Sequence, residues 1–186
     1  MVKVRNSAFV AAPVLLGGYG VVRLLSGHGP GIGWTVGHLL FLGGLVLFVP
    51  VLLTLGDRPG AAPVVAAVGL LGLAASAAQV VIDVVVGLLA NDRTGMNALY
   101  HQVQSVPGLL PSVYVIGPAL FYVCLIVLAT INWRVLGWWS PVLLAVGTGL
   151  TLLSLDLIPA TAVCFLFAIG PYGVRRTDRR LTGATQ

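Results

Sequence analysis

The stretch from Ala62 to Leu89 reads APVVAAVGLLGLAASAAQVVIDVVVGLL, and Asp83 is its single charged residue. An apolar run of about 20 residues suffices to cross the hydrocarbon core of a bilayer as an α-helix. Across the whole chain 58% of residues are hydrophobic and 8% are charged, whereas soluble domains carry roughly 25% charged residues. The sequence therefore predicts an integral membrane protein and excludes a disordered chain, a coiled coil and a nucleic-acid-binding domain.

Other apolar segments lie on both sides of this run. The last of them, residues 138–174, would form a single helix about 55 Å long, beyond a hydrocarbon core of about 30 Å. Pro159 disfavours a helical conformation of the residue before it, so we expect a break within Leu155–Pro159. The predicted fold is an all-α polytopic membrane helix bundle, one domain over residues 1–186, with six transmembrane helices, or five if the last segment is unbroken. The six spans are Ala8–Leu25, Gly33–Leu55, Ala62–Leu89, Leu109–Ile131, Trp138–Leu155 and Ile158–Val174.

The distribution of basic residues favours six spans, because an even number places both termini on one side of the membrane. Only Arg23 and Arg93 then lie on the opposite side, and the rule that basic residues stay inside makes both termini cytoplasmic in the cell membrane. The basic residues on the terminal side are Lys3, Arg5, Arg58, Arg134, Arg175, Arg176, Arg179 and Arg180.

The loop between the third and fourth spans contains a candidate interfacial helix at residues 94–106. Its apolar residues recur at helical spacing, and Thr94 is the expected N-cap. An ordered connector without membrane contact is the alternative.

Nearly all polar residues within this topology gather at the outer end of the bundle, where chemistry is therefore expected. The candidate pocket residues are Trp34, Gln79, Tyr100, His101, Gln104, Tyr114, Phe121 and Tyr122.

Asp83 is the leading candidate for a catalytic acid, because an isolated aspartate in hydrocarbon costs roughly 2.5–3.5 kcal/mol on insertion and therefore needs a cavity or a partner. Removal from water favours the protonated carboxyl group, which suits a general acid. The alternative is a structural bond from Asp83 to Arg23 or His38. Asp156 and His38 are further catalytic candidates, with a helix cap and a packing histidine as their alternatives.

No cofactor or metal site is expected. The His, Cys and Asp residues include no pair at the i, i+3 or i, i+4 spacing of helical metal ligands, and the glycines match no phosphate-binding motif. The expected partners are the lipid bilayer and a lipophilic small molecule. Association into a homo-oligomer is left open by the sequence.

Two resemblances extend these expectations. The segments Gly37–Gly43, Val49–Leu53 and Val103–Pro118 resemble a broad group of small, mostly uncharacterised actinobacterial membrane proteins, which implies a six-span bundle. The isolated acids in an apolar chain are similar to those of the integral membrane terpene cyclases of meroterpenoid and indole-sesquiterpenoid biosynthesis. No DxDD or DDxxD motif of the soluble cyclases is present.

The second resemblance implies proton-initiated cyclisation of a prenylated, isoprenoid-type substrate. Asp83, with Gln79 beside it, would be the acid, and His38 or Asp156 would take the final proton. Trp34, Tyr100, Tyr114, Phe121 and Tyr122 would line the cavity, and the loop helix would act as a lid.

Two other functions remain open at this point: a small proton-coupled transporter and a non-catalytic accessory subunit of a membrane complex. A cavity that is closed below and opens sideways to lipid would favour the enzyme. A path joining both faces of the bundle would favour transport, and no cavity at Asp83 would favour the accessory role.

Overall fold

The computed structural model describes residues 2–26 and 29–183, with side chains for residues 6–26 and 29–174, and these residues contain helices and no strand. Their order along the chain is α1 Val2–Ser26, α2 Ile32–Gly56, α3 Ala62–Leu89, α4 Arg93–Gln104, the π-helix η1 Leu110–Ile116, α5 Gly117–Ile131, α6 Trp133–Leu136, α7 Trp139–Leu153, the 3₁₀ turn η2 Leu155–Leu157 and α8 Ile158–Gly183.

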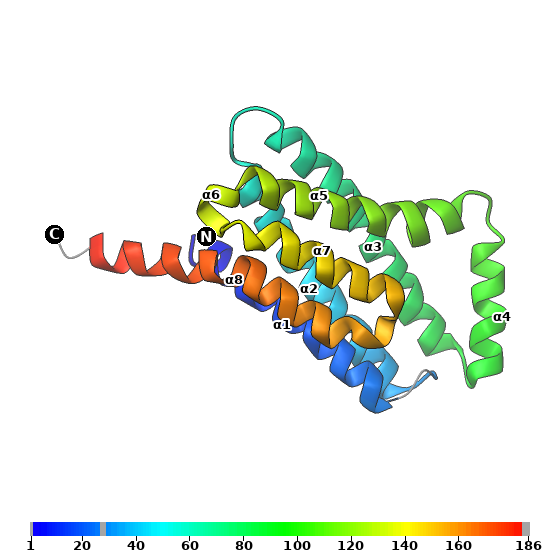
Figure 1. The fold of residues 1–186 in the computed structure, drawn as a ribbon. Coiled ribbons are helices and arrows are strands. Elements are labelled where there is room, and N and C mark those ends of the chain that lie inside the picture. Colours follow the sequence, from blue (N-terminus) through cyan, green and yellow to red (C-terminus); the bar gives the residue numbers. More distant parts are fainter. Residues whose placement is uncertain (1, 27–28, 184–186) are drawn as a thin grey trace.

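Five helical segments of the described chain are long and apolar enough to cross a membrane, which confirms the predicted all-α polytopic bundle. The remaining apolar helix, α7, has 15 residues and is shorter than these five. It packs along α8 and is joined to it by η2, at the predicted break before Pro159. Both termini lie at one end of the bundle (Figure 1), as an even number of passes requires.

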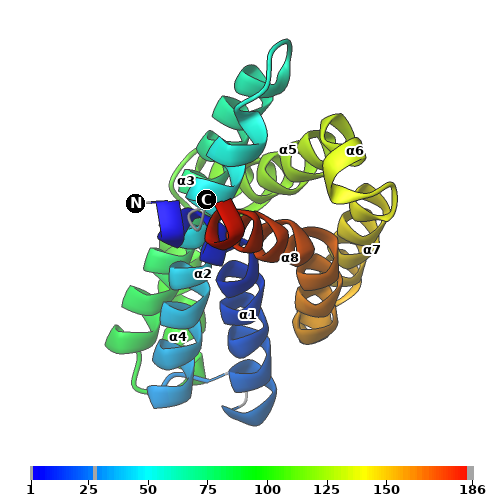
Figure 2. The ribbon, with the colours of Figure 1, turned by 90° about the vertical axis from the view of Figure 1, so that its left-hand side faces the viewer.

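The helices of the bundle form a ring. In order around it, α1 contacts α2, α2 contacts α3, α3 contacts α5, α5 contacts α7, α7 contacts α8, and α8 returns to α1. Figure 2 shows this order from the end that carries the termini. The contact between α5 and α7 is the least extensive of the six, so the ring is weakest there.

Packing at the end near the termini fills the centre of the ring. Leu52 of α2, Leu125 and Leu128 of α5, Leu144 of α7 and Ile169 of α8 are all fully buried. Asn132 joins two helices here, since its side-chain amide donates to the backbone oxygens of Leu55 (3.0 Å) and Leu128 (2.8 Å). This half of the bundle therefore behaves as a closed hydrophobic core.

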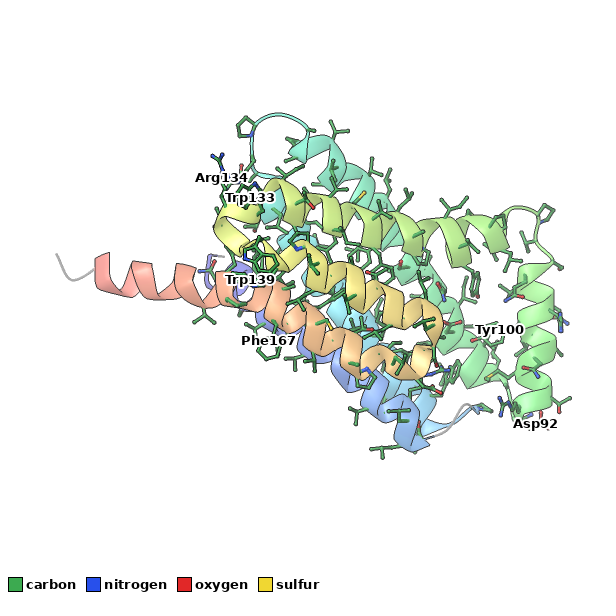
Figure 3. The ribbon with its side chains drawn as sticks, in the orientation of Figure 1. Asp92, Tyr100, Trp133, Arg134, Trp139 and Phe167 are labelled. Carbon is green, nitrogen blue, oxygen red and sulfur yellow. The ribbon has the colours of Figure 1, made fainter. Side chains whose placement is uncertain are left out.

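The loop helix α4 lies across the opposite end of the bundle (Figure 1) and contacts α3. Asp92, and not Thr94, caps it, because Oδ1 of Asp92 accepts a hydrogen bond from the backbone N–H of Gly95 (2.7 Å). The predicted cap was therefore wrong. An acceptor on the residue just before the first helical turn can reach the unpaired N–H groups, and Asp92 occupies that position. Figure 3 shows Asp92 and Tyr100 at this end and Arg134 at the other.

Gly72 is a point of close contact between α3 and α5. A Cβ atom there would lie 2.5 Å from the backbone nitrogen of Phe121 and 2.6 Å from the backbone oxygen of Gly117. Because backbone atoms cannot rotate away, Gly72→Ala should force the helices apart and destabilise the fold by about 1–3 kcal/mol. We expect Tm in detergent to fall by roughly 2–10 °C. Gly149→Ala is the matched control, since nothing lies within 4 Å of its Cβ position, and equal Tm values for the two variants would contradict this account.

Both termini lie at the same end of the bundle as Arg134 (Figures 1 and 3), which leads to a prediction about orientation. A green fluorescent protein fused after Gln186 should fluoresce in the cytoplasm. Alkaline phosphatase inserted after Asn91, at the opposite end of the bundle, should be active outside it. The reverse pattern would show that the bundle is inverted.

Candidate functional site

A cavity of about 730 Å³ occupies the half of the bundle that lies under α4. Its side chains come from every helix of the ring, from η1 and from α4. Thus the centre of the ring is filled near the termini and hollow at the other end. The residues that line the cavity are Tyr19, Arg23, Trp34, His38, Phe41, Leu45, Ser76, Gln79, Asp83, Tyr100, Gln104, Tyr114, Val115, Pro118, Ala119, Phe121, Tyr122, Val123, Thr148, Thr151, Leu152, Leu155 and Ile158.

The carboxyl group of Asp83 is the centre of the polar wall of this cavity. Its Oδ1 accepts a hydrogen bond of 2.7 Å from the hydroxyl of Tyr100, on α4. Its Oδ2 lies 3.8 Å from Nε2 of His38, on α2. The indole N–H of Trp34 donates to the backbone oxygen of Asp83 (2.7 Å), which ties the start of α2 to α3. Of the two structural partners considered for Asp83, the structure brings His38 close to it and pairs Arg23 elsewhere.

The imidazole of His38 has one defined role for each nitrogen. Nδ1 lies 2.8 Å from the backbone oxygen of Trp34, which can only accept, so Nδ1 carries the hydrogen. In the neutral ring Nε2 is then the free base, and it faces the carboxyl of Asp83. The ring is held by Trp34 (centroids 4.2 Å apart) and Tyr19 (5.2 Å). The site therefore places one acid and one base side by side in fixed orientations.

Tyr100 donates a hydrogen bond to Asp83 from α4, the helix that lies across this end of the bundle. Burial raises the pKa of the Tyr100 hydroxyl, and the neighbouring Asp83 carboxyl raises it further. The phenol therefore remains protonated near neutral pH and continues to donate to Asp83. This bond also joins α4 to the bundle over the polar wall.

Aromatic rings form the floor of the cavity. Phe121 and Tyr122 line it, with ring centroids 5.1 Å apart. Phe48 packs against Phe121 and Phe165 packs against Tyr122, and both phenylalanines are fully buried below the cavity. The floor thus separates the cavity from the core near the termini.

The cavity opens sideways between α5 and α7. Val115 and Val123, on the η1–α5 side, are 60% and 55% exposed, and Leu152 at the end of α7 is 80% exposed. All three also line the cavity, so its wall reaches the outer surface of the bundle along the least extensive contact of the ring. Since this surface is apolar, the opening faces the lipid.

Most of the residues predicted from the sequence lie around this cavity: Asp83, His38, Trp34, Gln79, Tyr100, Gln104, Tyr114, Phe121 and Tyr122. Two predicted residues do not. His101 is on the exposed face of α4, because one residue in a helix turns the side chain by about 100° from Tyr100. Asp156 is not part of the cavity wall either.

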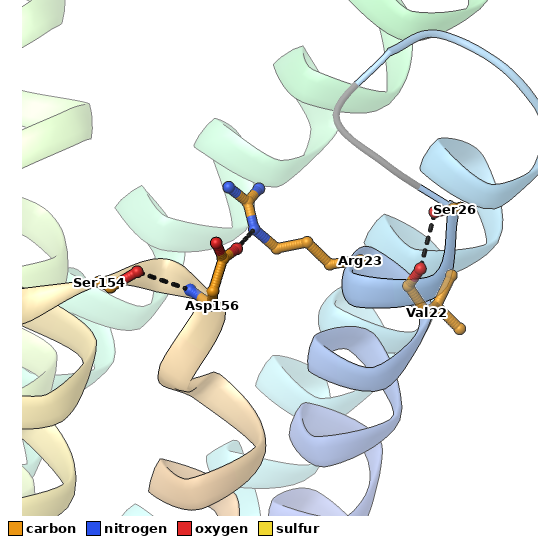
Figure 4. Close-up of polar contacts among 5 residues, drawn as sticks. All are labelled: Val22, Arg23, Ser26, Ser154 and Asp156. Carbon is orange, nitrogen blue, oxygen red and sulfur yellow. Dashed lines mark hydrogen bonds and ion pairs between the residues drawn. The ribbon is translucent and has the colours of Figure 1, made fainter.

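Asp156 instead joins α1 to the turn between α7 and α8. Its Oδ1 lies 3.1 Å from Nε of Arg23, and its backbone N–H donates to Oγ of Ser154 at 3.2 Å (Figure 4). Its side chain is 47% exposed. This arrangement supports the structural alternative for Asp156, a cap and ion pair at the turn between α7 and α8.

Sequence reasoning missed several cavity residues. Phe41 is three residues after His38 and therefore shares its helix face, so helical spacing was a usable signal for it. Ser76, Thr148 and Thr151 gave no such signal, because each hydroxyl bonds to a backbone oxygen of its own helix and such residues occur widely in membrane helices.

Among the side chains of residues 6–26 and 29–174, no three of His, Cys, Asp or Glu lie close enough together to hold a metal ion.

Comparisons with protein-family models, with curated proteins and with solved structures find no match to this chain.

The Tyr100–Asp83 hydrogen bond should hold α4 in place. Its loss in Tyr100→Phe should speed amide hydrogen exchange in residues 93–104 by roughly three- to tenfold, the equivalent of one hydrogen bond. Exchange can be followed by mass spectrometry in nanodiscs. Tyr114→Phe is the matched control, because the buried Tyr114 hydroxyl has no hydrogen-bond partner in the described part of the chain. Unchanged exchange in Tyr100→Phe would show that other contacts hold α4.

Proposed function

We propose that this protein is a membrane-embedded terpene cyclase that starts the cyclisation of a prenylated, isoprenoid-type substrate by donating a proton. The observation that carries the proposal is the position of Asp83. Its carboxyl group lies in the wall of a large, mainly apolar cavity that is closed by aromatic rings below and opens to lipid at the side. A lipophilic chain can enter such a cavity from the bilayer without crossing water.

The proton balance of the reaction follows from the two groups that face each other. Asp83, in its protonated form, adds its proton to a terminal alkene or epoxide of the substrate and becomes a carboxylate. Ring closure transfers the positive charge along the chain without changing the number of atoms. The cyclic cation then loses a proton to Nε2 of His38, which lies 3.8 Å from Oδ2 of Asp83. Return of this proton to Asp83 restores the starting state, so the reaction is an isomerisation.

Aromatic faces would stabilise the cation between these two proton transfers. A positive charge over the face of Trp, Tyr or Phe is stabilised by about 2 kcal/mol or more when water is excluded. Trp34, Phe121 and Tyr122 present rings to the cavity, and each is fixed by a neighbouring ring or hydrogen bond. Their rigidity keeps the stabilising faces in position while the substrate changes shape.

The two other functions are supported less well. A transporter needs a path to the other face, and the described side chains fill the bundle below the rings of Phe48 and Phe165. An accessory subunit would pair its buried acid fully and would need no cavity beside it. With cytoplasmic termini the cavity lies in the outer half of the membrane, a location that a lipophilic substrate reaches through the bilayer.

The test is a direct assay of the protein in lipid nanodiscs. Farnesylated and geranylgeranylated aromatic compounds would be incubated with the unaltered protein, with Asp83→Asn and with His38→Gln. Products would be identified by chromatography, mass spectrometry and NMR, because cyclisation leaves the mass unchanged. We expect cyclic products from the unaltered protein. Loss of a general acid or base typically lowers the rate by about 10²–10⁴-fold. The cyclisation rates of both variants should therefore fall by at least about 10²-fold.

Asp57→Asn is the matched control, because Asp57 is exposed in the α2–α3 loop at the other end of the bundle. It should turn over substrate at the unaltered rate. Undiminished cyclisation by Asp83→Asn would remove Asp83 as the acid. Absence of product from every substrate, combined with proton-coupled uptake in proteoliposomes, would replace the cyclase by a transporter.

A further inference from the structure

Three hydrogen-bonding side chains beside Asp83 are not used by the proposed proton transfers. They are Gln79 on α3, Gln104 on α4 and Tyr114 on η1, and all three line the cavity. The Tyr114 hydroxyl is buried and has no hydrogen-bond partner among residues 6–26 and 29–174. Within the same residues, no hydrogen bond joins the side-chain amides of Gln79 and Gln104 to another group.

Their positions place these groups on one wall. Gln79 precedes Asp83 by four residues on α3, and Gln104 follows Tyr100 by four residues on α4, so each lies one helical turn from a member of the Asp83–Tyr100 pair. Tyr114 is close enough to Asp83 and to Tyr100 for an electrostatic interaction with each of them. Three separate elements thus bring hydrogen-bonding groups to the polar wall.

The buried Tyr114 hydroxyl costs free energy while it has no partner, and a ligand that bonds to it recovers that free energy. The amides of Gln79 and Gln104 are half-buried, so a ligand that covers them must bond to them to replace their water. Amides offer both a donor and an acceptor, and a phenol does the same. A bare hydrocarbon chain would leave all three groups unsatisfied. The wall therefore suits a ligand that carries its own donors and acceptors.

The charged groups of the cavity lining limit further which class of ligand can bind. Arg23 is the single Lys or Arg side chain in the described lining, and its Nε is engaged by Asp156. A diphosphate needs several cationic groups or bidentate arginine contacts to replace its water. Gln79, Gln104 and Tyr114 are neutral and Asp83 is acidic, so the wall favours an uncharged group.

We propose that Gln79, Gln104 and Tyr114 form a subsite for an uncharged, hydrogen-bonding head group of the substrate, such as a carboxamide or a phenol. The prenyl chain of the same substrate folds back through the apolar part of the cavity, over Phe121 and Tyr122. This inference rests on the proposed function for the reaction at Asp83. The subsite would act in binding, by selecting among prenylated substrates according to their head groups.

Binding is measured without turnover, through the fluorescence of Trp34. Trp133, Trp138 and Trp139 are replaced by Phe, which leaves Trp34, in the cavity wall, as the only tryptophan. The nanodisc-embedded protein is titrated with 3-farnesyl-4-hydroxybenzamide, with farnesylbenzene and with farnesyl diphosphate. Concentrations are expressed as mole fraction in the lipid, so that partitioning into the bilayer is common to all three.

We expect the benzamide to bind at least roughly tenfold more tightly than farnesylbenzene, and farnesyl diphosphate not to displace it. Gln79→Leu, Gln104→Leu and Tyr114→Phe should each weaken benzamide binding by roughly three- to tenfold, the loss of one hydrogen bond. Their affinity for farnesylbenzene should stay unchanged, which also shows that each variant is folded.

Equal affinities of the unaltered protein for the benzamide and farnesylbenzene would overturn the subsite, and this comparison depends on no variant. Tighter binding of farnesyl diphosphate would overturn it too. Asp83→Asn should keep the preference for the benzamide. A preserved preference without cyclisation of any substrate would refute the proposed reaction and leave the subsite standing, so the two failures are distinguishable.

Discussion

The half of the bundle under α4 depends on the contacts that surround the buried carboxyl group of Asp83. An aspartate inside an apolar helix needs partners, and here they come from two other elements: Tyr100 from α4 and His38 from α2. The indole of Trp34 bonds to the backbone of the same residue. These contacts fix α4 over the bundle and fix the orientation of the histidine. The contacts of this one buried carboxyl group thus position both the helix that covers the cavity and one of its walls.

The bundle is solid near the termini and hollow under α4, because the two ends carry different side chains at the centre of the ring. Near the termini, leucine and isoleucine side chains pack to complete burial, and Gly72 lets α3 and α5 approach closely. Beyond the rings of Phe48 and Phe121, the same helices carry polar and aromatic residues that line the cavity and do not fill it. The weak contact between α5 and α7 leaves this space open to lipid. A closed base thus supports a cavity of about 730 Å³ above it.

Several particulars of the site could be predicted from residue type and spacing. The four-residue intervals from Gln79 to Asp83 and from Tyr100 to Gln104 put each pair on one helix face, and all four residues line the cavity. His101 and Asp156 lie outside the cavity wall, each for its own reason. One is rotated out by helix geometry, and the other meets Arg23, which lies 133 positions earlier in the chain. Such a distant partner leaves no local pattern in the sequence.

That the chain is a membrane helix bundle follows from the amino-acid sequence alone, because apolar runs of this length cannot be buried in a soluble domain of this size. The sequence likewise implies that polar groups gather at one end, since the helices alternate in direction. Which of these groups are in contact depends on how the helices pack. The 2.7 Å bond from Tyr100 to Asp83, the 3.8 Å approach of His38 and the opening between α5 and α7 depend on the relative tilt and rotation of helices. Those are set by packing over the whole ring, which no single segment encodes.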